Sequence, residues 1–252
     1  MKKKSALIIL IVGLLLILNQ TFLFLPTFFY SSLTIGVLLI ILLTRNLVRP
    51  FRKHGWLVWI LAPALFWLSI SLYATIIVGY FWIQALFLII AWFIYSYFNN
   101  LSHYLPNKTP ELNKKFDSIV LSGGVLICAA TGASLYGLSS FVSFSTTLLL
   151  LFFLPIAFLL FAQFAPLRKD FWLENKFLLP INILILLELA FALSFLPLNF
   201  NLLGFCLALG YYFLLTVMRL RWQGKLDRRN LRSLVILSVV IVFILFLSAR
   251  WL

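Results

Sequence analysis

One acidic residue, Glu188, stands near the middle of a long apolar run, flanked by leucine on both sides. If that run crosses a membrane, an ionised carboxylate there costs about 2.5–3.5 kcal/mol on insertion scales. No Lys or Arg stands at a similar depth in any apolar run. We therefore expect Glu188 to be a candidate intramembrane proton site or a structural hydrogen-bonding group. The polar residues at membrane depth that could serve it are Gln84, Thr131, Ser134, Gln163, Asn182 and Ser194.

The other residue types that could do chemistry do not form a recognisable site. The two histidines, His54 and His103, lie in separate basic or aromatic segments, whereas a zinc site needs at least three converging ligands. The two cysteines, Cys128 and Cys206, stand inside apolar runs without metal-type spacing. Gly137, Leu138 and Ser139 form a Gly-x-Ser stretch, with Ser139 and Ser140 expected at a turn, but no helix core holds a histidine or lysine that could activate a serine. The sequence therefore predicts no catalytic residue, metal or cofactor, and it does not favour an enzyme.

The composition indicates which elements must position Glu188. Hydrophobic residues make up 64% of the 252 positions and charged residues only 10%, whereas a soluble domain has about 25% charged residues. The net charge of +14 lies in short segments between apolar runs, which favours an anionic membrane surface over a nucleic acid as the partner. The chain is therefore predicted to be an integral membrane protein.

The apolar runs are close to the roughly 20 residues that a helix needs to span a bilayer, and they are apolar on every face. A membrane β-strand would instead alternate apolar and polar residues. The predicted fold is an all-α, polytopic bundle of about nine spanning helices in a single membrane domain, residues 1–252. The predicted helices are 5–25, 27–44, 56–75, 80–98, 117–137, 141–165, 177–196, 202–218 and 233–249.

The basic residues predict the orientation of this bundle. With nine helices, nineteen of the twenty Lys and Arg residues fall on one side, and only Arg250 falls on the other. Short basic loops stay in the cytoplasm, so the N-terminus is predicted inside and the C-terminus outside. Eight or ten helices would divide the basic loops between the two sides. The predicted location is the plasma membrane of a prokaryote.

Two segments are predicted to make specific contacts. In the run 117–137, Gly124, Cys128 and Gly132 recur every four residues, a small-residue row that lets two helix backbones pack closely or lets a helix unwind. The loop 219–232 mixes apolar and basic residues, which is typical of a short amphipathic helix at the membrane surface. Its residues predicted to contact anionic lipid head groups are Arg219, Arg221, Lys225, Arg228 and Arg229.

Two function classes fit these observations. The first is a non-catalytic membrane scaffold, or the membrane subunit of a larger complex. The alternative is a transporter or permease-like protein that uses Glu188 as a mid-membrane protonatable site. The predicted partners are membrane lipids with anionic head groups on the cytoplasmic side, and either a membrane protein partner or further copies of the chain. No nucleic acid partner is predicted.

Overall fold

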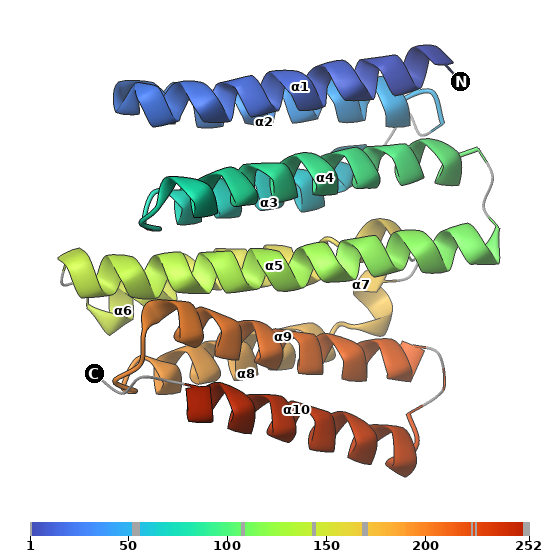
Figure 1. Cartoon of the computed structure of the whole chain (residues 1–252). Coiled ribbons are helices and arrows are strands. Elements are labelled where there is room, and N and C mark those ends of the chain that lie inside the picture. Colours follow the sequence, from blue (N-terminus) through green and yellow to red (C-terminus); the bar gives the residue numbers. More distant parts are fainter. Residues whose placement is uncertain are drawn as a thin grey trace. The chain divides into compact units, whose positions relative to one another are not determined.

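The structure, a computed structural model, describes residues 2–51, 56–106, 109–142, 145–167, 171–222, 224 and 226–248. Over these residues the chain is helical and contains no β-strand. The α-helices are α1 (Lys2–Phe24), α2 (Phe29–Val48), α3 (Leu61–Ala74), α4 (Tyr80–Tyr104), α5 (Pro110–Val142), α6 (Thr146–Ala162), α7 (Phe171–Glu174), α8 (Leu178–Leu193), α9 (Phe200–Trp222) and α10 (Arg228–Ser248) (Figure 1). Three 3₁₀ turns, η1 (Pro26–Phe28), η2 (Trp56–Ile60) and η3 (Ala165–Leu167), lie between them.

Six of the described helical segments are long and apolar enough to cross a membrane. They are Pro26–Val48, Trp56–Ala74, Tyr80–Tyr104, Pro110–Phe141, Thr146–Leu167 and Phe200–Trp222. Two shorter apolar segments are Ser5–Thr21 and Leu178–Leu193. A helix also overlaps each of the nine apolar runs, but a count of nine spanning helices stays a prediction. In length and composition, these apolar helices are those expected of an integral membrane protein.

Several predicted boundaries are wrong because helices continue past the apolar residues. The polar stretch 99–116, predicted as a loop, is mostly helical: α4 continues to Tyr104 and α5 begins at Pro110. Proline is favoured at the first helical position, where its missing N–H costs nothing, and Glu111 in the first turn faces the positive helix end. The Thr109 hydroxyl also accepts a hydrogen bond from the amide of Leu112 at 3.4 Å. Local capping chemistry, which hydropathy does not register, therefore fixes this helix start.

The helices divide into two compact units. Unit 1 contains residues 1–127 and 162–171, and unit 2 contains residues 128–161 and 172–252. In unit 1, α1 packs on α2 and α4, and α3 completes the bundle by packing on both α2 and α4 (Figure 1). The turn from α3 to α4 passes through Gly79 at φ +116°, a backbone conformation that favours glycine.

Aromatic side chains fill the core of unit 1. The ring of Phe66 stacks on that of Phe93, with ring centroids 3.8 Å apart. Farther along, the Tyr97 hydroxyl donates a hydrogen bond to the carbonyl of Trp59 at 2.9 Å. The ring of Phe116 from α5 lies against those of Trp59 and Tyr97, with centroids 5.8 and 5.1 Å away. Burying rings of this size contributes much of the packing energy of a core.

Hydrogen bonds from aromatic side chains to helix carbonyls link the helices of unit 2. The Tyr136 hydroxyl of α5 donates to the carbonyl of Ala190 in α8 at 2.8 Å. The Tyr211 hydroxyl of α9 donates to the carbonyl of Leu160 in α6 at 2.9 Å. All four residues are buried, so water does not compete for these hydrogen bonds. α9 also packs on α8 and α10.

Candidate functional site on helix α8

Helix α8 carries Glu188 and has two distinct faces. Pro180 stands in its first turn, where proline is tolerated, and the hydroxyl of Ser194 donates to the carbonyl of Phe191 at the other end, at 2.7 Å. The buried face comprises Leu179, Asn182, Ile183, Leu186, Ala190 and Leu193. The spacing of three and four residues is that of one helix face.

The opposite face of α8 is exposed, and Glu188 lies at its centre. Ile181, Leu184 and Phe191 on this face are 50%, 56% and 46% exposed, and Ile185 is also exposed. Glu188 is also exposed, and it lies three or four residues from Leu184, Ile185 and Phe191, as on one helix face. The structure therefore places the carboxyl on an outward apolar face of unit 2 and not among the buried residues of that unit.

None of the polar residues expected to serve Glu188 bonds to it in the described part of the chain. Gln84 forms a reciprocal amide pair with Gln20 in unit 1, at 2.6 and 3.0 Å. Asn182 is buried on the other face of α8, where its amide donates to the sulfur of Met218 at 3.4 Å. Of the remaining four, Thr131 and Gln163 have partners of their own. Ser134 donates to the carbonyl of Ala130 at 2.7 Å, and Ser194 donates to that of Phe191.

An apolar groove borders this part of unit 2. It has a volume of about 500 Å³ and lies among α8, α9 and α10. Ile185 and Leu189 of α8 line it, together with Gly210 and Phe213 of α9 and Val239 of α10. Glu188 is not among its lining residues. The groove therefore includes two neighbours of Glu188 on α8 but does not form a polar cavity around the carboxyl.

The small-residue row of α5 lies in packed surroundings. Gly124 is buried, and Cys128 is fully buried. A Cβ added at Gly132 would lie 3.0 Å from a methyl of Leu207 and 3.2 Å from the Cα of Gly204, both on α9. Gly132 therefore packs closely against Gly204, a residue that the sequence analysis did not single out. The signal for it was a small-residue pair on α9, Gly204 and Ala208, four residues apart.

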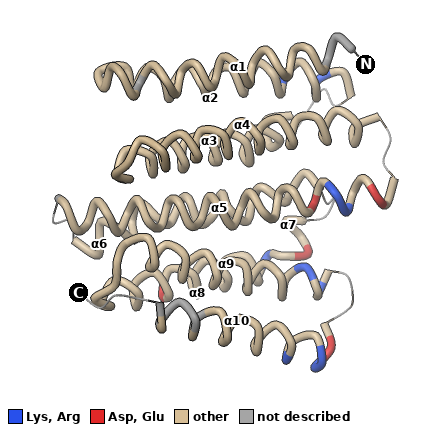
Figure 2. The backbone as a smooth tube through the Cα atoms, in the orientation of Figure 1, with Lys and Arg blue, Asp and Glu red and all other residues tan. Residues whose placement is uncertain are grey.

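The basic residues predicted to contact lipid head groups lie at helix ends. Arg219 and Arg221 stand in the last turn of α9, and Arg228 and Arg229 stand in the first turn of α10. Lys225 lies outside the described residues. The prediction of a separate amphipathic helix in this loop is wrong, because α9 continues to Trp222 and α10 begins at Arg228. Figure 2 shows that charged residues gather mostly at helix ends, while uncharged residues fill the middles.

The remaining candidates for chemistry do not converge. His103 is exposed in the last turn of α4, and His54 lies outside the described residues. Ser139 and Ser140, expected at a turn, belong to α5, where the Ser140 hydroxyl donates to the carbonyl of Tyr136 at 2.9 Å. Within the part of the chain that the structure describes, no three His, Cys, Asp or Glu residues could share a metal ion.

Comparison of the chain with protein families, with curated proteins and with solved structures finds no match. Functional proposals for the chain therefore depend on its own residues.

Proposed function

We propose that this protein is a non-catalytic membrane subunit that binds the transmembrane helix of a partner protein along the exposed face of α8. The proposed topology is nine spans with a cytoplasmic N-terminus, in the plasma membrane of a prokaryote. The distribution of basic residues supports that orientation, since nineteen of twenty fall on one side when nine helices cross. The observation that carries the proposal is the position of Glu188 on an outward apolar face.

Lipid hydrocarbon cannot form hydrogen bonds with the Glu188 side chain. Ionisable residues in membrane segments almost always face a protein interior or a water-filled cavity, because hydrocarbon offers them no partner. The neighbours of Glu188 on the face, Leu184 and Phe191, offer no hydrogen-bonding group. A partner helix that covers this face would remove the carboxyl from lipid and bury the leucine and phenylalanine at the same time.

The chemistry of Glu188 defines the partner helix. It must carry a hydrogen-bond donor or a basic side chain near the middle of the membrane, since the ligand is a carboxyl group. A second copy of this chain supplies no such cation, because no Lys or Arg lies at that depth in any of its apolar runs. Charge complementarity therefore favours a different polypeptide over a homodimer.

Site-specific photocrosslinking in native membranes tests this proposal. A photoreactive phenylalanine analogue at Leu184 or Phe191 should crosslink one polypeptide, and the same probe at Leu237, exposed on α10 of the same unit, should not. Glu188→Leu should abolish the crosslink, whereas Glu188→Gln, which keeps the shape and the hydrogen-bonding capacity, should retain more of it. The identified polypeptide must have a mid-membrane donor whose replacement by leucine has the same effect.

Three results would contradict the proposal. An absence of crosslinks from both α8 positions means that lipid covers this face. A product of twice the chain's mass means that a second copy occupies it. Crosslinks that persist at full yield in Glu188→Leu mean that the carboxyl does not select the partner. The alternative of proton-coupled transport needs Glu188 to line a polar cavity, and its exposed position among apolar residues does not favour that reading.

A further inference from the structure

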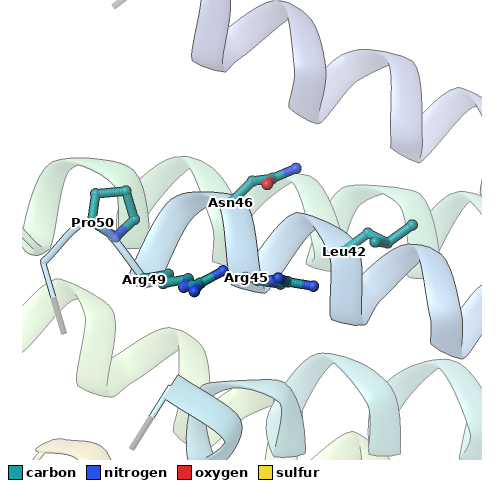
Figure 3. Close-up of a pocket in the computed structure, with 5 residues that line it drawn as sticks. All are labelled: Leu42, Arg45, Asn46, Arg49 and Pro50. Atoms are coloured by element: carbon teal, nitrogen blue, oxygen red, sulfur yellow. The ribbon is translucent and has the colours of Figure 1, made fainter. Parts of the chain in front are cut away.

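Two arginines at the end of α2 line a cavity in unit 1. This cavity is open, with a volume of about 720 Å³, and Leu42, Asn46 and Pro50 line it beside Arg45 and Arg49 (Figure 3). Arg45 stands in the last turn of α2, and Arg49 caps its end. Figure 3 shows the two arginine side chains along the same edge of the helix, one turn apart.

The arginines have no acidic partner among the described residues. Two like charges four residues apart on one helix face repel each other. The negative end of the helix dipole favours cations in the last turn, which accounts for part of this arrangement. A phosphate group between the guanidinium groups would turn the remaining repulsion into attraction, since each guanidinium can offer two parallel N–H donors. The amide of Asn46, on the same cavity, offers two further donors.

The face of α2 that leads to this cavity is apolar and exposed. Ile35, Leu38 and Leu42 are 45%, 53% and 50% exposed, and they lie at three- and four-residue spacing in line with Arg45 and Arg49. A helix face of this kind has the same order of apolar and charged parts as a membrane lipid. The apolar stretch fits an acyl chain, and the arginines at the helix end fit its head group.

We propose that Arg45, Asn46 and Arg49 bind the phosphate of an anionic membrane lipid whose acyl chain lies along Ile35, Leu38 and Leu42. This site is in unit 1 and does not depend on the partner proposed for α8. The shared chemistry of recognition is a phosphate group, which a free phosphate could also supply. The apolar stretch of α2 favours the lipid.

Native mass spectrometry of the purified full-length protein tests the site. The probes are phosphatidylglycerol, phosphatidylcholine and inorganic phosphate, each added to the protein in detergent. We expect phosphatidylglycerol to bind in preference to phosphatidylcholine. The double variant R45Q/R49Q should bind phosphatidylglycerol about tenfold more weakly, since each basic residue near an anionic surface adds a sizeable attraction.

A matched control separates this site from general electrostatics. K114Q/K115Q removes the same charge from exposed positions in the first part of α5, in the same unit, and should leave binding unchanged. R45K/R49K keeps the charge but loses the guanidinium forks, and we expect about threefold weaker binding. If R45Q/R49Q does not fold, as judged by its melting temperature, R45K/R49K decides the question alone.

The proposal is overturned by equal losses in R45Q/R49Q and K114Q/K115Q, because binding would then follow net charge. Unchanged binding in R45K/R49K would likewise show that the guanidinium geometry plays no part. If inorganic phosphate displaces phosphatidylglycerol at concentrations comparable to that of the lipid, the ligand is a free phosphate and the acyl-chain contact on α2 is wrong.

Discussion

Replacing Gly204 by alanine should destabilise unit 2 more than any similar change at the other glycines considered below. An added Cβ at this position of α9 would lie 2.6 Å from the carbonyl oxygen of Ala129, 2.6 Å from the amide nitrogen of Ala133 and 2.8 Å from the Cβ of Ala133, all on α5. Two of these atoms belong to the backbone, so no side-chain rotation relieves the clash. The two helices must separate instead.

The expected magnitude follows from two opposing terms. Overpacking of a well-packed core costs about 1–3 kcal/mol, and a backbone clash belongs at the upper end of that range. Alanine is more favourable than glycine inside a helix by about 1 kcal/mol, which offsets part of the cost. We therefore expect Gly204→Ala to lower the free energy of unfolding by about 2 kcal/mol.

Two other glycines provide a graded comparison. At Gly132 the nearest atoms to an added Cβ are 3.0 and 3.2 Å away, and the closer one is the end of a leucine side chain, so Gly132→Ala should change stability by less than about 1 kcal/mol. At Gly13 on α1 no atom lies within 4 Å, so Gly13→Ala should be neutral or slightly stabilising.

The assay is reversible denaturation of the purified protein in mixed micelles, followed by circular dichroism, with the free energy of unfolding compared among the three variants. The expected order of stability is Gly13→Ala, then Gly132→Ala, then Gly204→Ala. The reasoning is refuted if Gly204→Ala is within about 0.5 kcal/mol of the unmodified protein, since surface substitutions produce effects of that size. That result would mean that α5 and α9 do not approach each other through Gly204.

Three further predictions follow from the topology and the polar contacts. In a cysteine-free background, a cysteine at Gly224 should react with an impermeant reagent only from the cytoplasm and one at Asn199 only from outside, and the reverse pattern would invert the proposed orientation. Tyr136→Phe removes the hydroxyl that donates to Ala190 and should lower the free energy of unfolding by about 0.6 kcal/mol, the size found for hydrogen bonds between helices of one membrane protein, in the same assay. Asn19 is fully buried, and neither atom of its amide has a partner among the described residues, so Asn19→Leu should raise the free energy of unfolding by about 1–3 kcal/mol, whereas a loss of stability would show that the amide is satisfied.

The sequence alone determined that this chain is helical and belongs in a membrane, because its composition leaves too few polar residues to cover a soluble fold. It also located the helices, since a helix overlaps every predicted apolar run. Their ends were less predictable. Thr109 and Pro110 start α5 within a polar stretch of the sequence, through N-terminal capping. A hydropathy pattern does not detect such a start.

Tertiary structure decided which face of each helix packs against a neighbour. In water the buried face of a helix is the apolar one, so sequence periodicity predicts it. In lipid both faces are apolar, and α8 has leucine and isoleucine on its buried and exposed sides alike. Its orientation follows instead from close packing and from bonds such as that between Tyr136 and Ala190. For this reason the sequence singled out Glu188, but only the packing of unit 2 placed it on the outward face.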